Sequence, residues 1–528
     1  MDRRTFLRRA ARWALAIPIV GPIAAACTSG GSSPTPGSPT QAPPSSATPI
    51  GGTPWTQLVD QVKGSVIRPG DSAYRNARLD YDPRFDDIRP AAIVFAESER
   101  DVASTIAFAR ENHLAFAVRC GGHSYAGYSL SEGIVLDVSR MSAVRVEAGG
   151  LATVGASARL IDVVTGLAPA GVMVPSGTCA TVGISGLTLG GGQGVTGRLF
   201  GLTCDSLEAT RVVTADGRVL TCDANHHPDL FWALRGGGGG NFGVVTSFTF
   251  RTHAAPTLTL AALRWPWLAA GVALGAWQEW GPSAPPELWS SCRLQWEPGL
   301  GPTVGIEAVW AGPPSGLGPY LDTLSAMVGT APSRSVTTKS YLDAALYLAG
   351  CTGLSMSQCQ LITQSPAGKL EREASLARSD FFDRPISGSV ARSLLRSIAA
   401  RGDSGALASQ EGGVVLDAWG GRIAEVADDA SAVPHRQTKF LAQEYVTFKT
   451  AISDSLIAAN RKWLNGLWHG LRPAASGFAY VNYIDPDLSN SLPAYYGASL
   501  PRLIEVKQTY DPDNVFRSFQ GVPISTPA

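Results

Sequence analysis

The chain has 528 residues, of which 43 are basic and 43 acidic, so no net charge draws it towards a nucleic acid. Charged residues make up 16% of the chain and hydrophobic residues 45%, which excludes a wholly disordered chain and allows a large buried core. This length is typical of about two to four domains.

Residues 1–27 have the pattern of an export signal. Arg3 and Arg4 precede an apolar run that is too short for a membrane span of about 20 residues. The arginine pair resembles a twin-arginine signal, and the small residues that end at Cys27 resemble a lipobox, in which the cysteine carries a lipid. Residues 28–54 are rich in Pro, Ser, Thr, Gly and Ala, which is typical of a tether. We therefore expect an exported protein of the cell envelope or the medium, with a lipid at Cys27 as its membrane contact.

Glycine is concentrated in one part of the chain, because 25 of the 58 glycines lie between residues 119 and 245. The first burst, at 119–128, follows an expected helix that begins at the capping segment 98–101 and an expected strand at 115–118. Glycine-rich turns bring backbone N–H groups close to an anion, which suits a pyrophosphate.

Two further glycine bursts follow. The second, at 175–194, contains neither the GxxxxGK[ST] motif of a P-loop nor a strand–GxGxxG–helix unit, which argues against a triphosphate site and a Rossmann site. The third, at 236–240, leads into an expected strand at 247–250, and Asp216 and Gly217 predict a hairpin between the two bursts. Glycine clusters also occur in loops that close an irregular sheet, so the motifs that accompany them must decide between such loops and a cofactor site.

Five motifs accompany the glycines or follow them near the C-terminus. They are Arg-Cys-Gly-Gly-His-Ser at 119–124, the segment around Cys179, Gly-Gly-Gln-Gly at 191–194, Gly-Gly-Asn-Phe-Gly-Val-Val-Thr at 239–246 and the tyrosine-containing segment 480–520. The first four resemble the FAD-binding domain of the berberine-bridge-enzyme-like flavoprotein oxidases, and the last resembles the C-terminal module of that family. The middle of the chain contributes little to the resemblance.

The resemblance implies an α+β fold with three parts. Residues 55–254 would form an FAD-binding domain of the PCMH type with two subdomains. Residues 255–470 would form a substrate domain with an antiparallel sheet covered by helices. Residues 471–528 would form a berberine-bridge-enzyme-type module that returns to the FAD domain, because its tyrosines must reach the cofactor.

The resemblance also implies FAD held by two covalent bonds. His123 matches the histidine bonded to the flavin 8α-methyl group, and Cys179 matches the cysteine bonded to flavin C6, with Cys120 as an adjacent alternative thiol. The alternatives are a turn histidine and a buried thiol. Val182 matches a position at which a valine is typical of the oxidases of the family, so we expect O2 as the electron acceptor. The other residues expected around the cofactor are Arg119, Gly121, Gly122, Ser124, Tyr125, Gly183, Gly186, Val245 and Asn482.

Oxidation of an alcohol requires a base that takes the hydroxyl proton while a hydride leaves for flavin N5. Sugar-oxidising relatives use a tyrosine in the segment that matches 480–483, so Tyr483 is the first candidate and Tyr480 the second. Alternation along a strand would place these two side chains on opposite faces. Asp417 matches a carboxylate or amide that lies over the flavin, and buried there it must share a proton or accept a hydrogen bond. The alternatives are core aromatics for the tyrosines and a structural hydrogen bond for the aspartate.

We therefore predict FAD-dependent oxidation of a secondary or hemiacetal alcohol of a sugar or an aromatic natural product, with O2 reduced to H2O2. The alternatives are a dehydrogenase with a quinone or protein acceptor and an envelope-anchored binding lipoprotein. The histidines do not cluster at metal-ligand spacing, so no metal site is expected. Seven tryptophans between 265 and 310 would stack on sugars or, more often, pack a sheet. Cys351 and Cys359 could pair, but their spacing leaves this open.

Overall fold

The structure is a computed structural model that describes residues 53–448 and 453–525. The predicted export signal and nearly all of the predicted tether therefore lie outside the described residues. Within the described ranges, no helix is both long enough and apolar enough to cross a membrane.

The first subdomain of the FAD-binding region contains a four-stranded sheet of order β1-β2-β4-β3. Its strands are β1 (Ser65–Ile67), β2 (Ala92–Phe95), β3 (Phe116–Arg119) and β4 (Ile134–Asp137). Strands β2 and β3 run parallel to β4, and β1 is antiparallel to β2. Helix α4 (Glu99–Glu111) connects β2 to β3, and the Ser98 hydroxyl accepts the Asp101 N–H at 3.2 Å at its start. The predicted cap and the strand that follows are confirmed.

The second subdomain is a five-stranded antiparallel sheet of order β5-β6-β10-β8-β9. Its strands are β5 (Val144–Glu147), β6 (Leu151–Gly155), β8 (Leu207–Val213), β9 (Val219–Asp223) and β10 (Val244–Arg251). The hairpin predicted at Asp216–Gly217 is confirmed, since it joins β8 to β9 and Gly217 has a φ of +82°. Helices α5 (Leu160–Leu167), α6 (Ile184–Leu189) and α8 (Pro228–Ala233) complete this region.

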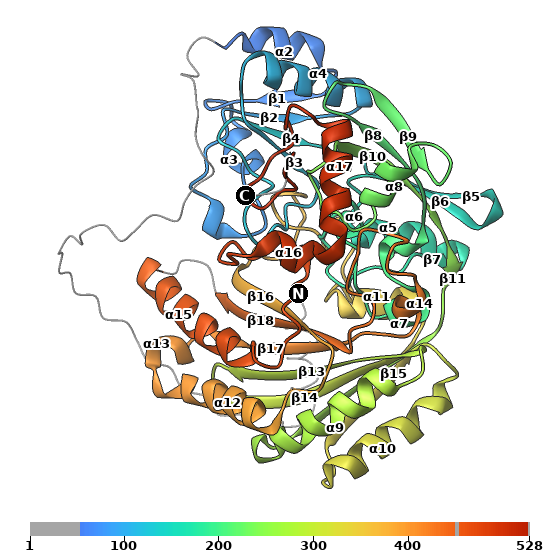
Figure 1. Cartoon of the computed structure of the whole chain (residues 1–528), viewed down its shortest axis with the longest axis vertical. Coiled ribbons are helices and arrows are strands. Elements are labelled where there is room, and N and C mark those ends of the chain that lie inside the picture. Colours follow the sequence, from blue (N-terminus) through green and yellow to red (C-terminus); the bar gives the residue numbers. More distant parts are fainter. Residues whose placement is uncertain (1–52, 449–452, 526–528) are drawn as a thin grey trace, which may run out of the picture.

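The third part is a seven-stranded antiparallel sheet of order β15-β12-β14-β13-β17-β18-β16. Its strands are β12 (Leu258–Trp265), β13 (Leu288–Glu297), β14 (Gly301–Trp310), β15 (Ser333–Lys339), β16 (Ala374–Phe382), β17 (Glu411–Ala418) and β18 (Phe440–Phe448). Four helices lie along its outer face in Figure 1: α9 (Ala270–Ser283), α10 (Leu317–Val328), α12 (Gly388–Ala399) and α15 (Asp454–Leu471). The predicted α+β class is thus confirmed.

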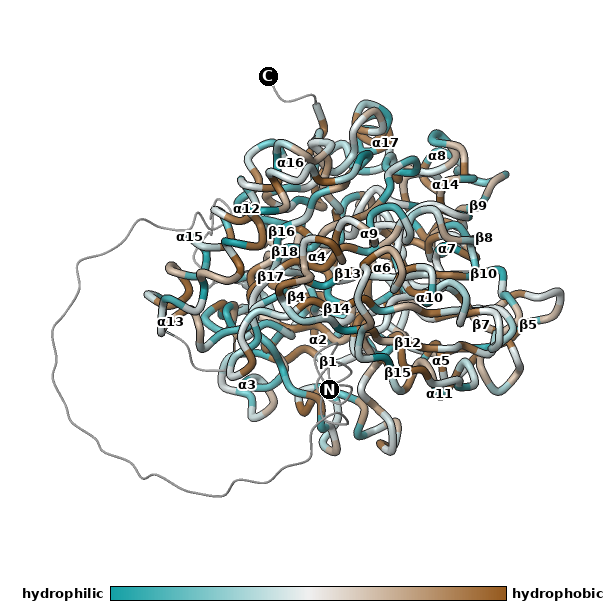
Figure 2. Tube along the Cα trace, turned by 90° about the horizontal axis from the view of Figure 1, so that it is seen from below, coloured by the Kyte–Doolittle hydropathy of each residue, from teal (hydrophilic) through white to brown (hydrophobic). Residues whose placement is uncertain are grey.

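The tryptophans of the third part pack its sheet. Six of the seven pack in the core between the sheet and the helices or against it: Trp265, Trp267, Trp277, Trp280, Trp296 and Trp310. The seventh, Trp289, belongs to a small cluster on the other face. Figure 2 shows that hydrophobic stretches lie largely inside the molecule, while its periphery is hydrophilic or mixed.

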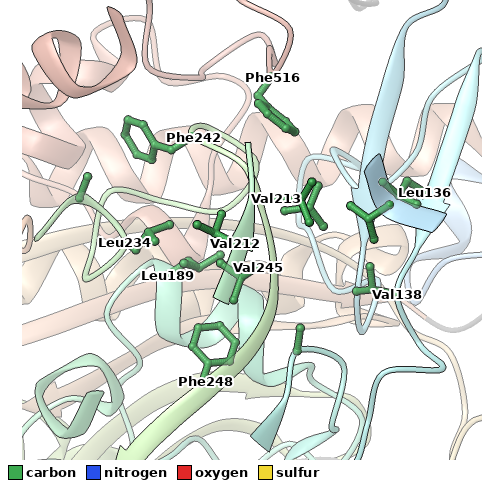
Figure 3. Packing of buried hydrophobic residues seen from close by; sticks show 14 of the residues in the cluster. Leu136, Val138, Leu189, Val212, Val213, Leu234, Phe242, Val245, Phe248 and Phe516 are labelled. Atoms are coloured by element: carbon green, nitrogen blue, oxygen red, sulfur yellow. The ribbon is translucent and has the colours of Figure 1, made fainter. Parts of the chain in front are cut away.

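The C-terminal module packs on the FAD-binding region. Its helices are α16 (Ser491–Tyr496) and α17 (Leu500–Tyr510), which lie beside the first two sheets in Figure 1. One hydrophobic core includes Leu136 of the first subdomain, Val245 of the second and Phe516 of this module (Figure 3). The buried Lys507 ammonium donates to the Asn241 carbonyl at 2.8 Å, which fixes α17 next to the third glycine burst.

Cys351 and Cys359, whose pairing the sequence left open, form a disulfide with a Cα–Cα distance of 5.5 Å. The loop that they close lies between α11 (Tyr341–Leu348) and β16 and packs against Ala180, beside the second glycine burst. The other described cysteines lie outside disulfides: Cys120, Cys179, Cys204, Cys222 and Cys292.

Candidate active site

Two loops that carry predicted attachment residues meet backbone to backbone. The first follows β3 and contains His123, and the second is the turn between Cys179 and α6. A Cβ atom on Gly121 would lie 2.3 Å from the Gly183 nitrogen, and one on Gly183 would lie 2.1 Å from the Cys120 sulfur. Both glycines are therefore required for the close approach of the two loops, and this approach brings His123 and Cys179 into one region.

The His123 imidazole is held on two sides. Its Nε2 lies 2.9 Å from the Thr181 hydroxyl, and its ring stacks on Tyr81 with a centroid distance of 4.0 Å and an interplanar angle of 22°. Burial lowers the pKa of His123 to about 3, so the ring is neutral at physiological pH. Sequence reasoning missed both partners, although Thr181 stands only two residues after Cys179.

Behind this loop lies a buried carboxyl group. Gly122 has a φ of +68°, and a Cβ atom there would lie 1.6 Å from Asp80 Oδ1, so only glycine fits. Burial raises the pKa of Asp80 to about 7, although Arg119 acts in the opposite direction. Arg119 itself donates to Asp137 Oδ2 at 2.5 Å and to the Ala77 carbonyl at 2.6 Å. Its side chain therefore anchors the base of the loop.

The alternative thiol, Cys120, is directed into the protein. Its sulfur lies 3.1 Å from the Ala156 carbonyl oxygen and 3.4 Å from the Ser157 hydroxyl. Burial raises the pKa of the Cys120 thiol, which disfavours the reactive thiolate. Cys179 lies on the turn at the loop contact and is half-buried, as is Cys120. The raised pKa of Cys120 therefore favours Cys179 as the predicted attachment residue.

The loops fit the FAD that the sequence predicts. The N–H groups of residues 121–124 have no acceptor among the described residues, so they can bind phosphate oxygens. A Cβ atom on Gly186 would have no neighbour within 4 Å, whereas those on Gly121, Gly122 and Gly183 would collide with the protein. Of these four glycines, Gly186 is therefore the one with free space beside its α-carbon, where a ring system could lie.

The remaining residues predicted around the cofactor have partners within the protein. The Ser124 hydroxyl accepts the Tyr128 N–H at 3.1 Å, and the Asn482 amide donates to the Leu187 carbonyl at 2.9 Å. Val182 is half-buried, and Val245 lies in the core between the subdomains (Figure 3). The side chain of Val245 thus packs the scaffold, and only its backbone could face a ligand.

The two candidate tyrosines lie on a 3₁₀ turn rather than a strand, since η9 spans Val481–Tyr483. The expectation of strand alternation was therefore wrong. The Tyr480 oxygen accepts the N–H groups of Gly192 at 2.9 Å and Gln193 at 3.1 Å, and burial raises its pKa to about 12. Tyr480 thus anchors the second glycine burst and is poorly suited to act as a base.

Tyr483 lies at the boundary between the FAD-binding region and the seven-stranded sheet. Its half-buried ring is parallel to that of Tyr125, with a centroid distance of 5.9 Å and an interplanar angle of 6°. The Tyr125 hydroxyl accepts the amide of Gln443, on β18, at 2.9 Å. Asp417, on β17, is buried and points to the same face of the sheet as Gln443, because Val415, two residues away, pairs with Gln443. The predicted base and the predicted assisting carboxylate are thus brought to one face of the sheet.

That face carries a polar network that sequence reasoning missed. Arg293 donates to the Tyr445 hydroxyl at 2.9 Å, and both Gln295 and Glu411 offer an acceptor oxygen to the single proton of this hydroxyl, that of Glu411 at 3.1 Å. All four side chains are buried. A signal was available, because β13 carries polar residues at every second position from 291 to 297, while Leu288, Cys292, Leu294 and Trp296 alternate with them and Ser290 is the one polar residue on the other face.

Comparison with known proteins agrees with this arrangement. A family model described as an FAD binding domain matches residues 90–223, and one described as berberine and berberine like matches residues 479–523. The FAD-linked oxidoreductase YgaK of Bacillus subtilis is 33% identical over 474 residues, which are 88% of this chain and 97% of YgaK.

Solved structures agree as well. Berberine-bridge-enzyme-like 1 of Physcomitrella patens is 28% identical, with a TM-score of 0.80 over 89% of this chain and 99% of its own. A chitooligosaccharide oxidase is 25% identical, with a TM-score of 0.78 over 88% of this chain and 98% of its own.

The fold and the loops define a flavoprotein of the FAD-binding PCMH type. The chain belongs to the berberine-bridge-enzyme-like FAD-linked oxidoreductases. The resemblance that the sequence motifs indicated is therefore confirmed, and so is the assignment as an oxidoreductase.

Proposed function

We propose that this oxidoreductase acts on an alcohol group of a sugar or an aromatic natural product, with O2 as the acceptor and H2O2 as the product. The polar face of the seven-stranded sheet carries the proposal. Buried hydrogen-bonding groups favour a substrate that satisfies them, so a hydroxyl-rich sugar is the preferred class. The similarity to a chitooligosaccharide oxidase supports the same class.

The proposed cofactor attachment is bicovalent, through His123 and Cys179. It is supported by the contact between their loops and by the neutral state of the imidazole. When bound, FAD accepts a hydride at N5. The N–H groups of residues 121–124 would hold its phosphates, and the open face at Gly186 would lie against its ring.

The proposed base is Tyr483, which would take the hydroxyl proton as the hydride leaves the carbinol carbon. The parallel ring of Tyr125 orients Tyr483, and Gln443 in turn holds Tyr125. Asp417 would accept a hydrogen bond from the substrate hydroxyl or from the base. We assign no proton transfer to Tyr480, the second candidate, because its oxygen already accepts two N–H groups of the glycine turn.

An oxygen-consumption screen tests the proposal. Purified holoprotein is supplied with monosaccharides, oligosaccharides and aromatic alcohols while O2 consumption and H2O2 are measured. We expect sugars to give equal amounts of O2 consumed and H2O2 formed. Turnover with a redox dye but none with O2 would identify a dehydrogenase instead, and colourless protein would contradict flavin chemistry altogether.

Acid precipitation tests the attachment. Flavin should stay in the pellet for the wild type and for His123→Ala, which retains the Cys179 bond. The variant His123→Ala/Cys179→Ser should release all its flavin into the supernatant. Release from the wild type would contradict both bonds.

Export remains a proposal that depends on residues outside the described ranges. We propose twin-arginine export followed by lipid anchoring at Cys27. Replacement of Arg3 and Arg4 by lysine should keep the protein in the cytoplasm, and Cys27→Ser should move it from the membrane fraction to the soluble fraction.

A further inference from the structure

The partner of His123 Nε2 is itself rigidly held. Thr181 is buried, with an exposed fraction of 4%, on the turn between Cys179 and α6. The residues on either side of it are fixed to the start of α5, since the Ala180 carbonyl accepts the Ile161 N–H at 3.1 Å and the Val182 carbonyl accepts the Leu160 N–H at 2.9 Å. The Thr181 hydroxyl is therefore in a defined position when the imidazole meets it.

The plane of the imidazole is fixed as well. Tyr81 stacks on the ring, and the Tyr81 N–H donates to the Gly122 carbonyl at 3.0 Å, one residue before His123. Nε2 lies at the Thr181 hydroxyl, and the ring also hydrogen-bonds the Thr181 backbone. Nδ1 has no contact with this hydroxyl, and it is the nitrogen to which we assign the bond to the flavin.

We propose that Thr181 is a positioning residue for covalent attachment of the flavin to His123, acting by holding the imidazole tautomer. This inference rests on the attachment proposed above. Before attachment the Thr181 hydroxyl accepts the Nε2–H, which leaves the lone pair on Nδ1. After attachment Nε2 carries no proton, and the same hydroxyl donates to it. A hydroxyl can reverse its role in this way, whereas a backbone carbonyl or N–H cannot.

Formation of this bond releases two protons and two electrons. The Nδ1 lone pair bonds the 8α carbon, that carbon loses one of the two protons, and Nε2 loses the second. The two electrons and two protons remain with the isoalloxazine until dioxygen removes them as H2O2. A protonated imidazole would lack the Nδ1 lone pair, and burial, which lowers the pKa of His123 to about 3, keeps the ring neutral.

The test uses a Cys179→Ser background, in which His123 is the one remaining attachment point. Thr181→Val removes the hydroxyl at constant shape, and Thr181→Ser retains it. Thr188→Val is the matched control, because Thr188 is a buried threonine on α6 whose hydroxyl has no hydrogen-bond partner among the described residues. Each variant is expressed in air, and the fraction of its flavin that is acid-stable is measured at intervals after protein synthesis is stopped. The peptide that contains His123 is then weighed by mass spectrometry.

We expect Thr181→Val to slow attachment by at least about tenfold, as for the loss of one hydrogen bond to a reacting group. It should still bind flavin that acid releases, while Thr181→Ser and Thr188→Val should attach flavin at the rate of the background. Equal rates for Thr181→Val and the background would overturn the proposal. So would loss of all flavin from both Thr181 variants, which would show a structural role only. No acid-stable flavin in the Cys179→Ser background itself would refute attachment at His123, and with it the role of Thr181.

Discussion

The two faces of the seven-stranded sheet are built for different purposes. On the face covered by helices, Leu294, Ile306 and Leu416 pack with six tryptophans in a continuous hydrophobic core. On the opposite face of the same strands, Arg293 and Asp417 are buried, and Arg293 donates to the Tyr445 hydroxyl. Because side chains alternate along a strand, each strand of this sheet contributes to both faces at once.

This difference indicates that the two faces contribute differently to the stability of the domain and to the proposed substrate specificity. The helix-covered face supplies apolar burial, which holds the domain together. The polar face costs free energy to bury and is maintained by hydrogen bonds, and under the proposed function it serves to bind the substrate. Substitutions on the two faces should therefore separate in their effects.

The largest expected effect is on catalysis at the polar face. Tyr483→Phe should lower kcat/KM by about 10²–10⁴-fold, because it removes the proposed base. The ring that stacks on Tyr125 remains, so the melting temperature should change little. Tyr480→Phe is the contrasting variant and should cost about 1–3 kcal/mol of unfolding free energy, since two buried N–H groups lose their acceptor. Full turnover by Tyr483→Phe would exclude it as the base.

The next largest effect is on stability at the helix-covered face. Trp277 is fully buried in the core there, and its indole N–H donates to Ser290 at 3.0 Å. Trp277→Ala should lower the unfolding free energy by about 3–5 kcal/mol in urea denaturation. Ser291→Ala, one position along β13 from Ser290 and on the opposite face, should cost less than about 1 kcal/mol. Similar losses for both variants would remove the distinction between the faces.

A smaller effect is expected within the polar network. Tyr445→Phe removes the hydroxyl that joins Arg293, Gln295 and Glu411. If this network binds substrate, KM should rise about tenfold while kcat stays within about threefold, as for one lost hydrogen bond. Steady-state kinetics with the best sugar from the screen gives both values. An unchanged KM would assign the network to the structure of the sheet alone.

The smallest expected effect concerns pH and Glu444, a buried carboxyl group on β18. Burial raises the pKa of Glu444 well above its usual range, and the nearby Asp380 acts in the same direction. A raised pKa in the folded state contributes stability at low pH that is lost as the pH rises through that pKa. The melting temperature of Glu444→Gln should therefore rise relative to that of the wild type as the pH increases from 4 to 8. A difference that stays constant over this range would contradict the raised pKa.

Local motifs were sufficient to predict much of this molecule. The cap at Ser98, the hairpin at Gly217 and the strands beside the glycine bursts depend on residues close in sequence, and the structure confirms them. The placement of His123 and Cys179 on neighbouring loops followed from the family resemblance. Their contact depends on glycines whose function becomes clear only when both loops are seen.

Contacts between distant residues could not be predicted. Thr181 lies 58 residues from His123, and Tyr480 meets Gly192 across 288 residues, so neither partner is visible in a local pattern. The 3₁₀ turn at Val481–Tyr483 also overturned the strand alternation, and its Asn482 amide bonds the distant Leu187 carbonyl, a contact that no local pattern shows. The polar network required the register of β13 against β17, which a single sequence does not specify.

The shared core of Leu136, Val245 and Phe516 has a consequence for biosynthesis. Part of the apolar surface of the first subdomain stays uncovered until the segment that contains Phe516 has been translated. Pairings over such separations fold slowly and leave intermediates exposed to aggregation and proteolysis. A nascent chain that lacks α17 and Phe516 should therefore expose this surface to chaperones and proteases, so folding of the first subdomain depends on a segment far along the chain.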